Sequence, residues 1–362
     1  MKNEKNAPIL SPEAVNALLS WYDANARDLP WRKTSDPYRI WISEIMLQQT
    51  RVEAVKPYYK RFLEAFPTVS DLATAPEEKL LKLWEGLGYY SRARNLQKAA
   101  RVLVEQYGGS MPADERALQK LPGIGDYTAG AIASIAFGLR APAVDGNVLR
   151  VLSRVSGSYA DIALSETKAD FRASLREVIP ERSGAFAQAL IELGACVCVP
   201  NGEAKCGLCP LAPWCVAKRD GKTEELPVKS AKKPRRIEEK TVLLIRDGDR
   251  TALHKRPEKG LLAGLYEYPN LPGHLSPEEL TPKIRSMGFE PLQLTRLEDS
   301  KHLFTHIEWR MIAYAVKIAP EFDVYHPESG FLLVRDDDFC KNYAVPSAFS
   351  AYTKHWKKGN EK

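Results

Sequence analysis

The stretch Leu121 to Asp145, LPGIGDYTAGAIASIAFGLRAPAVD, decides how the first half of this chain folds. Its opening residues predict a turn between two helices, because Pro122 ends the preceding helix and Gly123 and Gly125 permit positive φ. Such a turn leaves backbone N–H groups free at a helix N-terminus, where they can hold a phosphate. An apolar run follows and ends in an isolated carboxylate, Asp145. On these residues alone, an ordinary helical joint with Asp145 as an N-cap remains the alternative.

Composition limits the class of protein. The length of 362 residues suggests two domains, and 44% hydrophobic residues are enough for buried cores. No window of about twenty apolar residues is present, so no membrane span is expected. The N-terminus MKNEKNAPIL lacks the apolar core of a signal peptide, and we expect a cytoplasmic protein. A net charge of +6 permits nucleic-acid binding without requiring it.

Apolar residues have helical spacing in the first part of the chain. Residues 1 to 226 therefore predict an all-α domain, which begins with a helix capped by Ser11 ahead of Pro12. The clearest helical patterns lie at 38–49, 52–65, 89–106, 127–138, 147–156 and 183–197.

A charged segment divides the chain. Residues 227–240, which include KSAKKPRRIEEK, have little to bury and predict an interdomain linker; contact with DNA phosphates is the alternative. Residues 241–362 predict an α+β domain with a helix at 276–287 and a turn at 247–249. Its expected strands are Thr241–Ile245, Thr251–His254, Arg310–Ile318 and Gly330–Val334.

Four of the six cysteines are clustered, with the spacing Cys198-x7-Cys206-x2-Cys209-x5-Cys215. In a cytoplasmic chain this clustering favours a metal centre over disulfides. Four thiolates can hold zinc or an iron–sulfur cluster, and the spacing alone does not separate the two. The remaining cysteines, Cys196 and Cys340, are expected to be structural.

Two carboxylates occupy unlike surroundings. The helical neighbours of Glu44 are Ile40, Trp41, Leu47 and Gln48, so Glu44 lies on a mostly apolar face. Burial there would raise its pKa toward that of a general acid, whereas a structural Glu paired with an Arg is the alternative. Together with Asp145, it could serve hydrolysis of an N-glycosidic bond, in which one group protonates the leaving base and the other stabilises the sugar cation.

The order of motifs resembles one enzyme family. WISEIMLQQTRV, WEGLGYYSRARNL, LPGIGDYTAGAI, AVDGNVLRVLSR and the cysteine loop follow one another as in the MutY-type adenine DNA glycosylases of the helix-hairpin-helix superfamily. The resemblance covers nearly the whole chain and implies that a [4Fe–4S] cluster is held by Cys198, Cys206, Cys209 and Cys215. The segment VPNGEAK makes the first gap of the cysteine loop one residue longer than is usual in that family.

The resemblance also implies roles for individual residues. Glu44 would protonate adenine N7 and Asp145 would stabilise the sugar cation, with support from Tyr127 and Asn147. The residues matching the adenine pocket are Arg27, Trp31, Leu47 and Gln188, and those matching DNA contacts are Gln49, Tyr89, Gly123 and Gly125. Gln49 and Tyr89 would wedge into the duplex where a base is flipped out. Tyr127 stands where bifunctional relatives carry a Schiff-base lysine, which implies base excision without strand cutting.

The second domain resembles the lesion-recognition domain of the same family, which has a Nudix-like fold. The resemblance lies in HKRPEKGLLAGLYEYPNL and HLFTHIEW, and the paired glutamates of Nudix hydrolases are absent, so nucleotide hydrolysis is not expected. Phe304, Thr305 and His306 replace the usual Phe-Ser-His, and the Thr305 hydroxyl can still donate to N7 of 8-oxoguanine. A hairpin tip without a ligand is the alternative.

The resemblance therefore implies a monomeric enzyme that acts at the nucleoid on double-stranded DNA and removes adenine mispaired with 8-oxoguanine or guanine. Two other functions remain open. One is an endonuclease III-like glycosylase and lyase for oxidised pyrimidines. The other is a non-catalytic protein that binds damaged DNA, in which Glu44 and Asp145 would be structural only.

Overall fold

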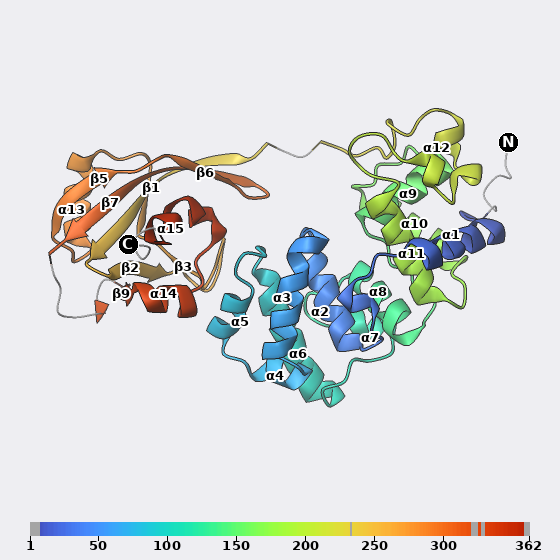
Figure 1. Cartoon of the computed structure of the whole chain (residues 1–362), viewed down its shortest axis with the longest axis horizontal. Coiled ribbons are helices and arrows are strands. Elements are labelled where there is room, and N and C mark those ends of the chain that lie inside the picture. The colour runs from blue at the N-terminus through green and yellow to red at the C-terminus, as the bar shows by residue number, and fades with distance from the viewer. Residues whose placement is uncertain (1–7, 232–233, 320–324, 327–329, 358–362) are drawn as a thin grey trace. The chain divides into compact units, whose positions relative to one another are not determined.

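The computed structural model describes residues 8–231, 234–319, 325–326 and 330–357, and it contains two packed units (Figure 1). The helical unit comprises Met1–Thr74 and Asn95–Ala231, and the sheet unit comprises Ala75–Arg94 and Lys232–Lys362. No helix in the described ranges is long and apolar enough to cross a membrane.

The helical unit contains no strand in its described part, as the apolar spacing predicts. The Ser11 side chain accepts a hydrogen bond from the Ala14 amide and so caps the first helix as expected. The helices are α1 (Pro12–Asn25), α2 (Pro37–Leu47), α3 (Val52–Ala65), α4 (Val69–Thr74), α6 (Ser91–Tyr107), α7 (Glu115–Gln119), α8 (Asp126–Phe137), α9 (Gly146–Ser156), α10 (Ser165–Arg176), α11 (Ser183–Cys196) and α12 (Val216–Arg219).

Helix α8 packs against α2 and α11, and α11 also packs against α9. Two glycines make these approaches close. A Cβ atom on Gly130 of α8 would lie 2.1 Å from the Pro142 carbonyl oxygen, and one on Gly194 of α11 would lie 2.6 Å from the Asn147 Cβ. Because neither position has room for a side chain, the loop that ends in Asp145 lies directly against α8, and the start of α9 lies against α11.

The predicted turn between α7 and α8 is confirmed. Gly123 has a φ of 77°, and a Cβ atom there would lie 2.6 Å from the Asn95 Cβ, so both its conformation and its surroundings require glycine. Gly125 has a φ of −90°, so of the two glycines only Gly123 uses the positive φ that the sequence permits. Gly125 is the N-cap of α8, no side chain caps this helix end, and the space beside its Cα is open.

The sheet unit is built on a mixed sheet that has nine strands among the described residues (Figure 1). Its main strand order is β5-β7-β1-β2-β9-β8, while β3 pairs with β2, β4 with β1 and β6 with β7. The strands are β1 (Arg236–Asp247), β2 (Arg250–Lys255), β3 (Tyr266–Glu267), β4 (Asn270–Pro272), β5 (Pro291–Arg296), β6 (Ser300–Leu303), β7 (Ile307–Ile318), β8 (Tyr325–His326) and β9 (Phe331–Arg335). The helices are α5 (Glu77–Leu83), α13 (Pro277–Ser286), α14 (Asp336–Asn342) and α15 (Ser350–Lys357).

The two central strands, β1 and β7, run parallel and are covered on both faces. Leu243 and Ile245 of β1 join a core with Ile284 of α13, whereas Val242 and Leu244 join a core with Phe349 on the other face. Burial on both faces explains the unbroken apolar run in β1. The predicted strands, the turn at 247–249 and the helix at 276–287 are all observed, and Ser276 caps that helix through a capping box.

The sheet begins earlier than the charge pattern suggests. Residues 236–240, expected to belong to the linker, form the start of β1 and pair with β7 from the register Arg236↔Ile307. Their side chains are mostly exposed, so the charges conceal a strand that is stabilised by main-chain hydrogen bonds. Ala75–Arg94 also packs with the sheet unit, where Glu78 accepts from Lys255 Nζ at 2.9 Å and from the Tyr266 hydroxyl at 3.0 Å. The side chain of Cys340 lies outside the described residues.

Candidate functional site

Glu44 is a buried carboxyl group on α2, with an exposed fraction of only 7%. The Tyr127 hydroxyl at the start of α8 donates to Glu44 Oε2 at 2.6 Å. Burial raises the pKa of Glu44 to about 7; the hydrogen bond from Tyr127 opposes this shift, and the charge of Asp145 adds to it. The apolar helix face predicted the burial. Near neutral pH, the carboxyl group can therefore both hold and release a proton.

Asp145 lies at the N-terminus of α9, where it caps the helix. Its Oδ1 accepts from the Val148 amide at 2.8 Å, and its Oδ2 accepts from Asn147 Nδ2 at 2.8 Å. Burial raises the pKa of Asp145, and these hydrogen bonds oppose the rise because they favour the charged form. The capping alternative is thus observed, yet a carboxylate that accepts one bond per oxygen keeps further lone pairs. Capping and a chemical role are compatible here.

Tyr127 remains neutral in this environment. Burial raises its pKa well above the usual value, and the charges of Glu44 and Asp145 act in the same direction. The structure thus brings Glu44, Tyr127, Asp145 and Asn147 together from α2, α8 and the start of α9.

Arg150 contacts Asn147, and the sequence motifs did not single it out as a site residue. Arg150 Nη2 donates to Asn147 Oδ1 at 2.9 Å and to the Gly194 carbonyl at 2.8 Å. Its Nε donates to the Cys198 carbonyl at 2.8 Å. Asp145, Asn147, Arg150 and the first cysteine of the loop are therefore joined by consecutive hydrogen bonds. The available signal was a charged residue on an otherwise apolar face of α9.

Arg27, one of the residues expected to line a base pocket, belongs to a buried ion pair. Arg27 donates to both carboxylate oxygens of Glu192, at 2.7 and 2.6 Å, and Arg32 Nη2 donates to Glu192 Oε2 at 2.8 Å. Glu192 is 1% exposed, and although burial opposes the shift, the hydrogen bonds from both arginines lower its pKa to about 2. Sequence reasoning missed Glu192 and Arg32, although a carboxylate within the apolar helix α11 was a usable signal.

The other expected pocket residues have separate contacts. Trp31 is buried and forms a T-shaped pair with the Tyr59 ring, at a centroid distance of 5.5 Å. Gln188 of α11 accepts from the Tyr22 hydroxyl at 3.2 Å. Leu47 is the last residue of α2 and is partly buried.

Gln49 and Tyr89, expected to wedge into DNA, are both exposed and both strained. Their φ angles are 58° and 45°, and among the described residues other than glycine only Leu262, at 57°, shares this left-handed conformation. Such conformations cost free energy and persist where the surroundings impose them, commonly at functional sites.

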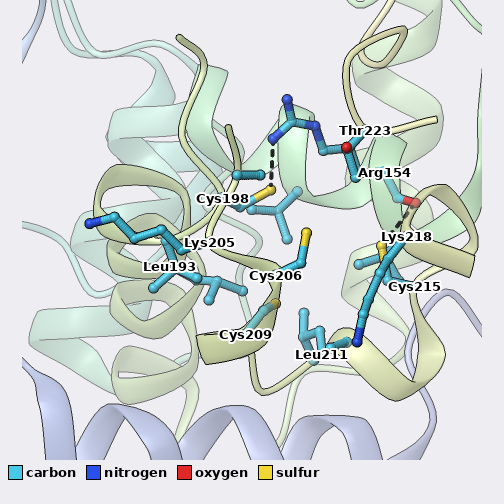
Figure 2. Close-up of a pocket in the computed structure, with 15 residues that line it drawn as sticks. Arg154, Leu193, Cys198, Lys205, Cys206, Cys209, Leu211, Cys215, Lys218 and Thr223 are labelled. Carbon is cyan, nitrogen blue, oxygen red and sulfur yellow. Dashed lines mark hydrogen bonds between the residues drawn. The ribbon is translucent and has the colours of Figure 1, made fainter. Parts of the chain in front are cut away.

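The four clustered cysteines line one pocket, which Figure 2 shows in close-up. All four are free and partly buried, and Leu193 and Leu211 contribute apolar walls. Arg154 Nη1 donates to Cys198 Sγ at 3.2 Å, and the basic residues Lys205 and Lys218 also line the pocket. Among the described residues, no three His, Cys, Asp or Glu side chains are grouped closely enough to hold a metal ion. The donor set nevertheless fits an iron–sulfur cluster, because thiolates are soft ligands and the basic residues offset their charge.

The sheet unit has a pocket of about 400 Å³ that brings together two expected sites. Tyr89 and Thr305 both line it, with their hydroxyl oxygens 3.1 Å apart, and His306 lines it as well. The Phe304 ring packs on Trp309 at a centroid distance of 4.8 Å. Phe304 therefore anchors the loop, and all three residues, Phe304, Thr305 and His306, line the pocket.

Comparisons with known proteins agree with this arrangement. The model of the HhH-GPD superfamily of base excision DNA repair proteins matches residues 42–181, and the NUDIX domain model matches residues 241–355. The human adenine DNA glycosylase is 35% identical over 385 aligned residues, which cover 89% of this chain and 70% of that protein.

Among solved structures, a thermostable thymine-DNA glycosylase superposes with a TM-score of 0.53 and 31% identity, covering 57% of this chain and 95% of that one. An endonuclease III bound to DNA superposes with a TM-score of 0.50 and 27% identity, covering 57% of this chain and 94% of that one. These findings agree with a helix-hairpin-helix domain followed by a Nudix-like domain.

Replacing Glu192 with Gln should lower the unfolding free energy at pH 7 by about 3 kcal/mol, because two arginines lose their shared partner in a buried site. Since pairing lowers the pKa of Glu192 from 4.5 to about 2, its stabilising effect is complete above pH 4.5 and is lost as the pH falls toward 2. The difference between the two proteins in thermal unfolding should shrink over that range. Glu181→Gln, an exposed change just before α11, is the control; equal melting temperatures for both variants would contradict the prediction.

Proposed function

The chain belongs to the family of adenine DNA glycosylases, and on that premise we propose that it removes adenine mispaired with 8-oxoguanine or guanine in double-stranded DNA. The reaction is hydrolysis of the N-glycosidic bond. The observation that carries the proposal is the buried Glu44 carboxyl group, whose pKa is raised to about 7 and which is hydrogen-bonded to Tyr127. A general acid needs a pKa near the working pH.

In the proposed reaction, Glu44 protonates the adenine as it leaves, and Asp145 stabilises the positive charge that develops on the sugar. Asp145 suits this role because the Val148 amide and Asn147 hold its carboxylate in one orientation. Arg150 fixes Asn147 in turn. The role of Asn147 and Arg150 is therefore to position the carboxylate rather than to react.

Tyr127 supports a monofunctional reaction. It keeps its proton at neutral pH, because burial raises its pKa well above the usual range. A phenol cannot form a Schiff base with the opened sugar, so water is the final nucleophile and strand cutting is not part of the cycle.

The proposed base pocket is formed by Arg27, Trp31, Leu47 and Gln188. Glu192 holds the Arg27 guanidinium through two hydrogen bonds, so the pocket has a fixed polar edge before substrate arrives. Preorganised polar groups of this kind discriminate between bases, because a wrong base leaves them unpaired.

Duplex binding is assigned to three features. No side chain caps the start of α8, so the backbone amides that follow Gly125 suit a phosphate, while Gly123 shapes the turn before them. Gln49 and Tyr89 are exposed and held in left-handed conformations, which suits residues that fill the gap left by a flipped base. In the sheet unit, the pocket shared by Tyr89, Thr305 and His306 is the proposed reader of 8-oxoguanine.

The proposed cofactor is a [4Fe–4S] cluster bound by Cys198, Cys206, Cys209 and Cys215. The four thiols share one pocket, and the resemblance of the cysteine loop to that of the adenine DNA glycosylases favours an iron–sulfur cluster over zinc. When bound, the cluster cross-links the loop through iron–thiolate bonds. Arg154 would hold the loop to α9, since it donates to Cys198 Sγ and to the Val199 carbonyl.

An excision assay tests the function. The protein should release adenine from duplexes with A:8-oxoguanine or A:G mispairs and should not release thymine glycol. Glu44→Gln should lower the single-turnover rate by about 100-fold or more while duplex binding persists, because the amide keeps the shape but has no proton to give. Glu64→Gln, an exposed change on α3, is the control. Release of thymine glycol alone would indicate the endonuclease III-like activity, and binding without any release would indicate a non-catalytic protein.

Tyr127→Phe should move the alkaline limb of the pH–rate profile to higher pH. Excision requires protonated Glu44, so the rate of the unmodified protein should fall as the pH rises through about 7. The hydrogen bond from Tyr127 lowers the pKa of Glu44, so its removal raises that pKa. Single-turnover rates between pH 5 and 9 measure the shift, with Tyr107→Phe on α6 as the control. A limb that stays in place or moves to lower pH would contradict the assignment of Glu44.

Anaerobically purified protein should be brown and contain about four irons and four sulfides per chain. Cys206→Ser should remove the visible absorbance, whereas Cys196→Ser should keep it, because Cys196 lies outside the four-cysteine pocket. Absorbance spectra and metal analysis measure both. A colourless protein with one zinc per chain would replace the iron–sulfur assignment with a zinc site.

Thr305→Val should reduce the preference for 8-oxoguanine over guanine opposite adenine by about 1 kcal/mol, or roughly fivefold, because one hydroxyl is lost while the shape is kept. Thr305→Ser retains the hydroxyl and should retain the preference. Paired Kd and single-turnover measurements on the two mispairs give the value. If Val at this position leaves the preference unchanged, lesion reading must lie elsewhere.

A further inference from the structure

The turn that precedes α6 is unusually constrained. Gly86, Gly88 and Tyr89 have φ angles of 99°, 69° and 45°, so three of four consecutive residues lie in the left-handed region. Glycine adopts this conformation readily, but tyrosine does not. Tyr89 is also 47% exposed, so its own burial cannot hold it in place. Other groups must impose its conformation.

Arg92 makes the contacts that can do so. Its Nη2 donates to the carbonyls of Leu87 and Gly88, at 2.8 and 3.0 Å. These two hydrogen bonds hold the main chain of the turn. The Arg92 guanidinium carbon lies 5.6 Å from the centroid of the Tyr89 ring, within range of a cation–π interaction. The Arg92 side chain thus contacts both the main chain of the turn and the Tyr89 ring.

Trp84 anchors this arginine. Its ring is fully buried and lies 5.3 Å from the Arg92 guanidinium carbon, and its Nε1 donates to the same Gly88 carbonyl at 3.1 Å. Burial lowers the pKa of Arg92 to about 10, which still leaves it charged at neutral pH. The Gly88 carbonyl therefore accepts from two donors, and the arginine contacts one buried and one exposed ring.

We propose that Arg92 is a positioning residue for Tyr89: it holds the strained turn and supports the ring, so that Tyr89 is already oriented for insertion into the duplex. The inference rests on the proposed role of Tyr89 as a wedge. A side chain that is already oriented loses little conformational entropy when it binds. The entropic cost of inserting Tyr89 into the duplex is therefore lower. Arg92 acts through Tyr89 rather than as a phosphate ligand.

The test uses the full-length protein and two readouts. One is single-turnover excision from an A:8-oxoguanine duplex. The other is the fluorescence of 2-aminopurine placed beside the 8-oxoguanine, which increases when the duplex is unstacked, whether or not adenine is released. The variants are Arg92→Met, Arg92→Lys, Tyr89→Ser and the double variant Arg92→Met with Tyr89→Ser. Arg101→Met is the matched control, because Arg101 lies on the same helix and also donates to a main-chain carbonyl, that of Ala73 at 3.1 Å.

Arg92→Met should reduce both readouts by roughly 10-fold, and Arg92→Lys should restore part of the loss, because lysine keeps the charge but cannot bridge two carbonyls as a planar fork. In the Tyr89→Ser background, Arg92→Met should cause no further loss, since the residue on which it acts is gone. The control should match the unmodified protein. Thermal unfolding of each variant shows whether the fold is retained, and Arg92→Lys carries the test if Arg92→Met fails to fold.

Three results would overturn the inference. Losses that multiply in the double variant would mean that Arg92 acts independently of Tyr89. Weaker duplex binding with a salt dependence reduced by about one charge would identify Arg92 as a phosphate ligand. Normal readouts in Tyr89→Ser would remove the wedge role itself, and the inference with it. An absence of adenine release with a normal fluorescence response would instead refute the proposed function while leaving the role of Arg92 supported.

Discussion

The hydrogen bond from the Tyr127 hydroxyl to Glu44 joins α8 to α2 at the point where the helical unit buries a carboxyl group. A buried carboxyl is costly when charged, so its surroundings must either keep it protonated or supply donors. Here one donor is supplied and the pKa remains near 7. This contact places two requirements on the rest of the helical unit. Helix α8 must approach closely enough for Tyr127 to reach Glu44, and Asp145 must lie near without pairing with it.

Close helix packing provides the first condition. The Pro142 main chain occupies the space beside Gly130, and Asn147 occupies the space beside Gly194, which places the loop before Asp145 against α8 and the start of α9 against α11. Buried arginines provide the second. Arg150 and Arg154 donate to the carbonyls of Gly194, Cys198 and Val199 at the end of α11 and just after it, and Arg154 also donates to the Leu226 carbonyl. The loop that ends in Asp145 and the cysteine loop are thus attached to the same helix, α9.

In both units, conformational strain is concentrated where DNA contact is proposed. Gln49 lies just after α2, Tyr89 lies before α6, and Leu262 lines the pocket that contains Thr305. Strain of this kind persists only when surrounding contacts outweigh it. For Tyr89 those contacts are visible in Trp84 and Arg92. The sheet contributes a platform, because β7 carries Trp309, on which Phe304 packs.

The sequence by itself determined the elements and the local features of this protein. Apolar spacing predicted the main helices and strands, Pro122 and Gly123 predicted the hairpin, and Ser11 predicted a cap, because each depends on residues a few positions apart. The clustering of four cysteines was equally plain. The resemblance to a known family supplied the proposed roles of Glu44 and Asp145, because the local sequence fits both a chemical and a structural role.

Only the tertiary structure decided which distant residues meet. It paired Glu192 with Arg27 and Arg32, joined Asn147 to the cysteine loop through Arg150, and placed Tyr89 beside Thr305. It also showed that the charged residues from Arg236 onward form a strand, since their pairing with β7 uses main-chain groups that hydropathy does not record. These contacts, and the pKa of Glu44, depend on burial and on distances between segments far apart in the chain. Sequence spacing does not carry that information, because it is set by how the helices and the sheet pack.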